Sequence, residues 1–131
     1  MGDRANVVIP QDGSEHEEKI YLYTHGSGTE LPATLQRALA RKQRWDDQPY
    51  LTRIIFEEMI TGAYSKETGY GISTYPSDGL SRLLIVDTEN QQVRIQLGDF
   101  DGKPSGEPTC YSFTEYVALN NPRWPGDEDD E

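Results

Sequence analysis

The spacing of apolar residues changes along this chain, and that change limits the possible folds more than any other feature of the sequence. Between residues 31 and 61 apolar side chains recur every three or four positions, which is the period of an amphipathic helix. After residue 69 they alternate with polar residues or form short apolar runs, as they do in strands. The chain therefore contains both kinds of element, and we expect them to share one core.

Two helices are predicted in the first of these regions. The first covers residues 32–44, and its apolar stripe consists of Leu31, Leu35, Ala38 and Leu39. The second covers residues 49–61 and begins after Asp47 or Gln48, because Pro49 suits the first turn of a helix. The short polar segment between them predicts a helical hairpin that needs a sheet to cover its apolar faces.

Strands are predicted on both sides of the helices. Residues 6–10 and 19–24, joined by a polar turn, indicate an N-terminal hairpin. Residues 70–75, 80–87 and 93–97, separated by turn signals, indicate a C-terminal meander. We therefore expect an α+β domain with an antiparallel sheet and a two-helix hairpin packed on one face.

The last part of the chain contains one segment of ambiguous secondary structure and an acidic tail. Residues 109–119 fit either a strand throughout or a short helix after Ser112. Five acidic residues in a row, 127–131, indicate a disordered tail in solvent, so residues 1–126 form the expected single domain.

Composition excludes several classes of function. The formal net charge of −11, from 23 acidic and 12 basic residues, disfavours binding to bulk DNA or RNA. No apolar run approaches the length of a membrane span and the first ten residues lack the features of a signal peptide, so we expect a soluble, cytoplasmic protein without a membrane partner. One cysteine and two distant histidines give no disulfide and no zinc spacing, and no metal or other cofactor is expected.

A glycine-containing loop after the second strand is the segment closest to known chemistry. It consists of His25, Gly26, Ser27, Gly28 and Thr29. A loop of this kind before a helix exposes backbone N–H groups that can bind an anion such as phosphate. It lacks the Gly-Lys-Ser/Thr ending of a Walker loop, so a plain strand-to-helix connection is the alternative.

Basic residues cluster on the first predicted helix, at Arg37, Arg41, Lys42 and Arg44. They form either a solvated helix face balanced by Asp46 and Asp47 or a dock for an anionic ligand or an acidic partner. At about 1.5 Å per residue, Arg37 alone lies near enough to the loop to share a ligand with it in one subunit. A homo-oligomer would remove that limit, and we lean toward one for this reason.

Residues 68–75 contain two glycines, Gly69 and Gly71, and two tyrosines, Tyr70 and Tyr75. Tyr70 and Tyr75 are candidates for contact with a ligand or a neighbouring subunit, because adjacent glycines let their rings approach closely. Ordinary cross-strand packing is the alternative.

Four stretches carry a resemblance to other proteins: IYLYTHG at residues 20–26, ELPATL at 30–35, YLTRIIFEEMI at 50–60 and TGYGIST at 68–74. Over residues 19–97 the chain resembles a group of small uncharacterised proteins of bacteriophages and bacteria. The resemblance implies an accessory or counter-defence factor that binds a host protein or sequesters a signalling nucleotide in the host cytoplasm. It implies no catalytic residue.

Three functions remain open from the sequence. The first is a non-enzymatic protein that binds an anionic small molecule or a host protein through the loop, the arginines and the tyrosines. The second is a small enzyme acting on a phosphorylated or nucleotide substrate, with His25 as acid or base and Glu30 or an arginine assisting. A carboxylate close to His25 would favour this enzyme. The third is a structural interaction protein, for which a large exposed apolar patch would be the sign.

Overall fold

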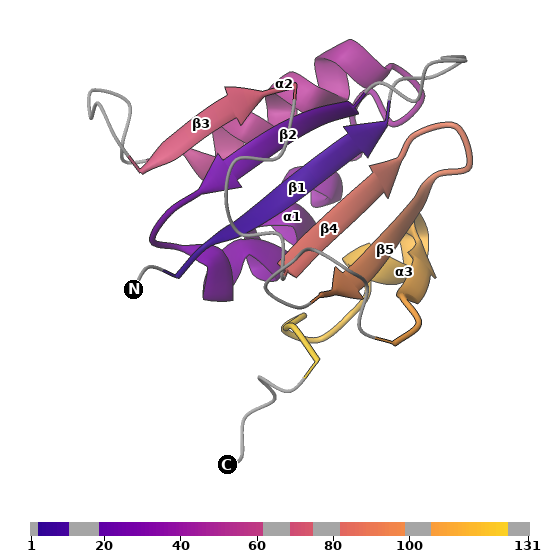
Figure 1. Cartoon of the computed structure of the whole chain (residues 1–131). Helices are drawn as coiled ribbons and strands as arrows, with labels where there is room; N and C mark the ends of the chain where they lie inside the picture. The colour runs from indigo at the N-terminus through magenta and orange to yellow at the C-terminus, as the bar shows by residue number, and fades with distance from the viewer. Residues whose placement is uncertain (1–2, 11–18, 62–68, 75–81, 99–105, 126–131) are drawn as a thin grey trace.

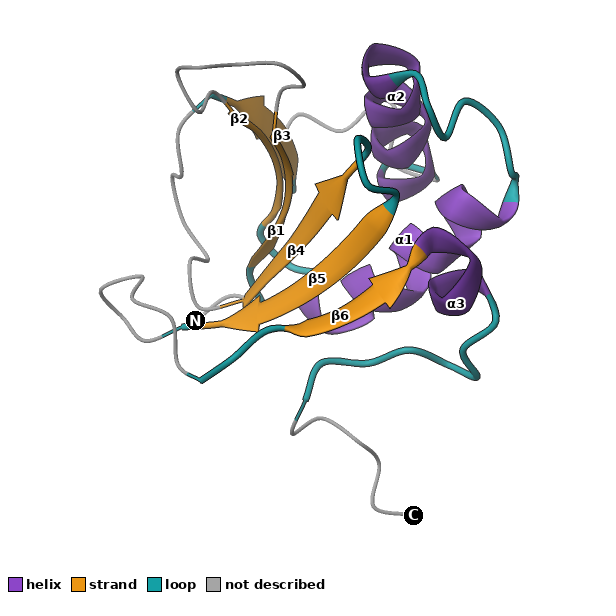
Figure 2. Ribbon diagram, turned by 90° about the vertical axis from the view of Figure 1, so that its right-hand side faces the viewer, coloured by secondary structure: helices purple, strands orange, loops and turns teal. Residues whose placement is uncertain are grey.

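The computed structural model of the chain describes residues 3–10, 19–61, 69–74, 82–98 and 106–125. It contains a six-stranded sheet whose helices all lie on one side (Figures 1 and 2). The predicted α+β class is confirmed. The strands are β1 (Ala5–Pro10), β2 (Lys19–Thr24), β3 (Tyr70–Ser73), β4 (Arg82–Asp87), β5 (Gln92–Leu97) and β6 (Thr109–Ser112). The helices are η1 (Gly28–Glu30, a 3₁₀ turn), α1 (Leu31–Ala40), α2 (Gln48–Met59) and α3 (Phe113–Val117).

The strand order is β3-β2-β1-β4-β5-β6, and every neighbouring pair is antiparallel except β1 and β4. The prediction of a wholly antiparallel sheet is wrong at that pair, and β3 lies at the edge beside β2 instead of starting a meander with β4. The reason is burial. Val7, Val8 and Ile9 of β1 are almost fully buried, so β1 must be a central strand with a partner on each edge. The apolar β4 supplies the second partner.

The first long helix ends four residues earlier than predicted. After Ala40 the chain turns toward α2, and Lys42 and Arg44 adopt positive φ angles of 56° and 60°. These left-handed conformations are uncommon for residues other than glycine and cost about 1–2 kcal/mol each. The predicted start of α2 is correct, since Asp47 is its N-cap.

The short helix that the sequence left open exists. Ser112 ends β6 and begins α3, accepting a hydrogen bond from the Glu115 backbone N–H at 3.0 Å. In return the Glu115 carboxylate accepts from the Ser112 backbone N–H at 2.8 Å. This capping box explains why the chain changes from strand to helix at that residue.

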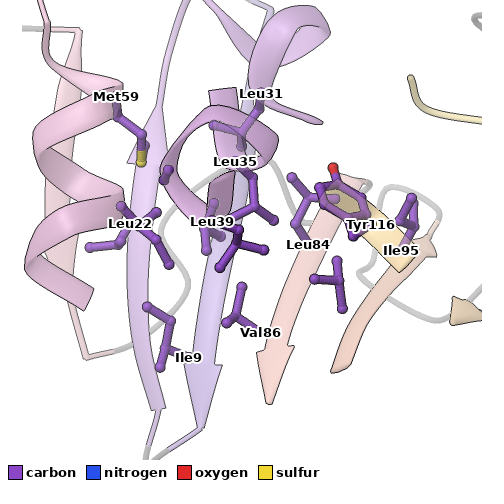
Figure 3. Packing of buried hydrophobic residues seen from close by; sticks show 14 of the residues in the cluster. Ile9, Leu22, Leu31, Leu35, Leu39, Met59, Leu84, Val86, Ile95 and Tyr116 are labelled. Carbon is purple, nitrogen blue, oxygen red and sulfur yellow. The ribbon is translucent and has the colours of Figure 1, made fainter. Parts of the chain in front are cut away.

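The buried apolar residues of the helices and of the sheet form one cluster. In Figure 3, Leu35 and Leu39 point from α1 toward the sheet, and Met59 of α2 belongs to the same cluster. Tyr116 of α3 lies beside Leu84 and Ile95. The buried Tyr116 hydroxyl donates to the Pro32 carbonyl at 2.7 Å, which ties α3 to the start of α1. Burial, and to a smaller extent Tyr111, raises the pKa of this phenol.

No helix in the described part of the chain is long and apolar enough to cross a membrane. The predicted polar turn at residues 11–18 and the acidic residues 127–131 lie outside the described residues.

Leu35→Ala tests the core beneath α1. The side chain is fully buried, so its truncation should lower the free energy of unfolding by about 2–5 kcal/mol in chemical denaturation. Ile72→Ala is the matched control, because Ile72 is 61% exposed on the edge strand β3 and should lose about 1 kcal/mol or less. Equal losses in the two variants would contradict the packing described.

Candidate functional site

The structure brings most of the predicted loop site together. His25, Gly26, Ser27, Gly28 and Thr29 connect β2 to α1 through η1. Tyr70 of the edge strand β3 joins them, since its hydroxyl donates to the Ser27 hydroxyl at 3.2 Å. Tyr75 lies outside the described residues.

The backbone N–H groups of His25, Ser27, Gly28 and Thr29 already have partners within the chain. The Thr29 N–H donates to both carboxylate oxygens of Asp3, at 3.1 and 3.0 Å, and the Thr29 hydroxyl donates to one of them at 2.9 Å. The Gly28 N–H donates to the Asp3 carbonyl at 2.7 Å, and the Ser27 N–H to the Thr24 hydroxyl at 3.1 Å. The donors of Thr29 therefore bind a carboxylate of the chain itself, that of Asp3.

Arg82 holds Asp3 in this position. Its guanidinium donates to the Asp3 carboxylate and, at 2.9 and 3.2 Å, to the Arg4 carbonyl. The same guanidinium lies over the ring of the buried Trp124, 5.5 Å from the ring centroid. The indole N–H of Trp124 donates to the Gly28 carbonyl at 2.7 Å. Residues near both ends of the chain thus meet at Gly28.

These contacts change the acidity of Asp3. Burial by itself raises the pKa of this carboxyl group, but hydrogen bonds from Arg82 and Thr29 outweigh it, so the pKa lies below its ordinary value. The ionised form is the one that the fold prefers.

His25 is surrounded by hydrogen-bond donors. Its Nδ1 accepts from the Arg4 Nε–H at 3.2 Å, and the Tyr23 hydroxyl lies 3.3 Å from the same nitrogen. A guanidinium can only donate, so Nδ1 of His25 is the acceptor in its contact with Arg4. Among the described residues, no carboxylate is within hydrogen-bond reach of His25. The neighbour of His25 that the structure describes is an arginine, Arg4, and not the carboxylate that would favour the enzyme hypothesis.

The predicted basic stripe faces α2, not the loop. Arg37 donates to Glu58 at 3.3 Å and to the Thr34 hydroxyl at 3.2 Å. Arg41 donates to Glu57 at 2.9 Å and to Glu58 at 2.8 Å, and these contacts raise its pKa. The described contacts of Arg37 are thus with α1 and α2 and not with the glycine loop, and the acids that pair with Arg37 and Arg41 lie on α2.

The turn that joins α1 to α2 lies on the helical side of the molecule (Figure 2). A groove lies beside this turn. Its volume is about 410 Å³. We call it the arginine groove, and its lining residues are Arg41, Gln43, Arg44, Tyr50, Arg53, Ile54 and Glu57.

The three arginines of the groove differ in how they are paired. Arg41 is engaged by two glutamates, and Arg44 makes a long 3.5 Å contact with Asp47. Arg53 makes no hydrogen bond or ion pair with any residue that the structure describes. The groove thus contains three guanidinium groups and one carboxylate, that of Glu57, in a chain whose net charge is −11.

Sequence reasoning missed Tyr50 and Arg53. Both belong to the first turns of α2, one helical turn apart, and they meet Arg41 and Arg44 because the two helices form a hairpin. Helical spacing on the predicted second helix was a signal that could have found them, since residues three apart share a helix face.

A second cavity of about 410 Å³ lies beside β5 and the C-terminal segment. Its lining residues are Ile95, Tyr111, Leu119, Asn120, Asn121, Pro122 and Arg123. It contains one cation, and it is a weaker candidate for an anionic ligand than the arginine groove.

Comparison with protein-family models, curated proteins and solved structures finds no significant match to this chain. In the part of the chain that the structure describes, no three histidine, cysteine or carboxylate side chains gather where they could hold a metal ion.

Asp3→Asn tests the internal anion. The pKa of Asp3 is lowered by folding, so its contribution to stability is present above the unfolded value near 3.9 and is lost as the pH falls below it. We expect the variant to lose about 1 kcal/mol at pH 7, a small value because the side chain is 36% exposed. The difference from the wild type should shrink below about pH 4 in thermal or urea unfolding. Asp46→Asn is the control, because Asp46 is exposed and has no described partner. It should change neither the stability at pH 7 nor the dependence of stability on pH.

Gly28→Ala tests the close approach around the loop. A Cβ at Gly28 would lie 2.6 Å from Arg82, 2.7 Å from the Asp3 carbonyl and 2.9 Å from the Arg4 backbone. We expect a loss of about 2 kcal/mol or more in chemical denaturation. Gly26→Ala is the control, because nothing lies within 4 Å of its Cβ position, and it should change stability by less than about 1 kcal/mol. Equal tolerance of both substitutions would refute the contact set at Gly28.

Proposed function

We propose that this protein is a non-enzymatic binding protein that holds a small anionic molecule, best a phosphorylated one, in the arginine groove. The observation that supports this most strongly is Arg53, whose guanidinium lines the groove without a partner among the described residues. Guanidinium groups match the oxygen geometry of phosphate and carboxylate groups and bind them through paired hydrogen bonds. Arg41 and Arg44 line the same groove and add to its positive charge.

The negative net charge of the chain favours a small anionic ligand over a long polyanion. A net charge of −11 repels long polyanions, whose phosphates would extend beyond the groove onto acidic surface. A small anion would interact mainly with the local cations, and the groove volume of about 410 Å³ falls in the range of small-molecule sites.

The chemistry of the groove favours binding over reaction. Its polar side chains are guanidinium, amide and phenol groups, which donate hydrogen bonds and supply charge. Its one carboxylate, Glu57, accepts a hydrogen bond from Arg41. The accessory or counter-defence role implied by the resemblance remains a prediction, but sequestering a signalling nucleotide would require a site of this chemistry.

Calorimetric titration with inorganic pyrophosphate at low salt tests the proposal. We expect saturable binding to the wild type and at least a ten-fold loss of affinity in Arg53→Gln, because a hydrogen bond to a charged group contributes about 1.5–3 kcal/mol. Lys42→Gln is the matched control: it removes the same charge from the adjoining turn, at a residue that does not line the groove.

The two substitutions separate a site from a general charge effect. A strong loss in Arg53→Gln with little change in Lys42→Gln supports the groove. Equal losses, or no saturable binding to the wild type, would show that the arginines are only a solvated helix surface.

A further inference from the structure

We propose that the ligand of the arginine groove is a nucleotide or a similar phosphate that carries a planar aromatic ring, and that this ring stacks on Tyr50. The inference rests on the anion-binding function proposed above and specifies its ligand class. It comes from the aromatic and amide side chains of the groove, which a bare phosphate would not use.

Tyr50 is exposed although its side chain is large and apolar. Its exposed fraction is 54%, and Tyr50 and Ile72 are the exposed large hydrophobic residues among those described. The ring lines the groove and does not pack into the core cluster. An aromatic side chain in this position offers a stacking surface for a flat ligand, as in many nucleotide-binding sites.

The guanidinium of Arg44 lies over that ring surface. Its guanidinium carbon lies 5.0 Å from the centroid of the Tyr50 ring. The guanidinium group is planar and a nucleobase is planar too, and both kinds of group stack on aromatic rings. A base could therefore replace Arg44 over the ring or stack on the guanidinium plane.

The backbone that places Arg44 there is strained. Arg44 has a φ angle of 60°, and Lys42, two residues earlier, has 56°. Left-handed conformations at residues other than glycine persist when the surrounding structure requires them, and they gather at binding sites. Here the turn directs one lining arginine across the lining tyrosine.

The spacing along α2 fits the two halves of a nucleotide. Tyr50 and Arg53 are three residues apart, so their Cβ atoms lie about 5–6 Å from each other on one face of the helix. A sugar can bridge that gap between a base on Tyr50 and a phosphate on Arg53. Gln43, which lines the groove and has no hydrogen bond to a described residue, offers amide donors and an acceptor to the edge of the base.

The test compares two probes that share a sugar phosphate and differ in the base: adenosine 5′-monophosphate and ribose 5-phosphate. In calorimetric titration we expect the first to bind the wild type at least five-fold more tightly, because stacking of a base contributes this much or more. Tyr50→Leu should remove the preference for adenosine 5′-monophosphate over ribose 5-phosphate. Tyr50→Phe, which keeps the ring, should retain it.

The possible results separate this inference from the proposed function. Equal affinity for both probes, each weakened by Arg53→Gln, would overturn the aromatic ligand and leave anion binding intact. A preference for the nucleotide that survives in Tyr50→Leu would overturn stacking on Tyr50. Binding of neither probe to the wild type, with pyrophosphate also inert, would overturn both proposals. Thermal unfolding of each variant verifies that it is folded, which we expect because Tyr50 is exposed.

Discussion

The contact between Arg82 and Asp3 is the interaction on which much of the described structure depends. It holds the segment before β1 against η1, and through Gly28 and Trp124 it reaches the C-terminal segment. Arg82 opens β4, the strand that pairs in parallel with β1. One guanidinium therefore joins the start of the central strand, the start of the first long helix and the last described residues. Because Arg82, Asp3 and Arg4 all lie close to Gly28, there is no room for a side chain at this position.

This contact also distinguishes the two candidate anion sites, the glycine loop and the arginine groove. The glycine loop has the donors of a phosphate site, but the carboxylate of Asp3 accepts from them. A carboxylate from the same chain is always present at high effective concentration, so an external anion would have to displace it and its partner Arg82. Among the residues that the structure describes, none forms an ion pair or hydrogen bond with Arg53 of the arginine groove, which is why we propose the function there.

The sequence predicted the α+β class, most strands and the start of α2, because periodicity and helix-capping residues are local signals. The parallel pairing of β1 with β4 could not be predicted in this way, since apolar spacing shows that a strand is buried but not which strand lies beside it. The end of α1 was missed because Arg41, Lys42 and Arg44 favour helices by propensity, whereas the path to α2 forces left-handed angles. The role of Asp3 could not be predicted either, because no motif or periodicity marks this residue. Its position depends on Arg82, which lies 79 residues away in the sequence. Tyr50 and Arg53 share a helix face that their spacing could have indicated, but that they line one groove with Arg41 and Arg44 is visible only in the folded chain.

The most direct test of the central claim is an NMR titration of the full chain with pyrophosphate, following backbone amides and arginine side chains together. Anion binding in the groove predicts the largest shift changes at Arg41, Arg44 and Arg53, with small changes at Gly28 and Thr29. The largest changes at Gly28 and Thr29, with the groove unaffected, would contradict it and show that the glycine loop exchanges its internal carboxylate for an external anion.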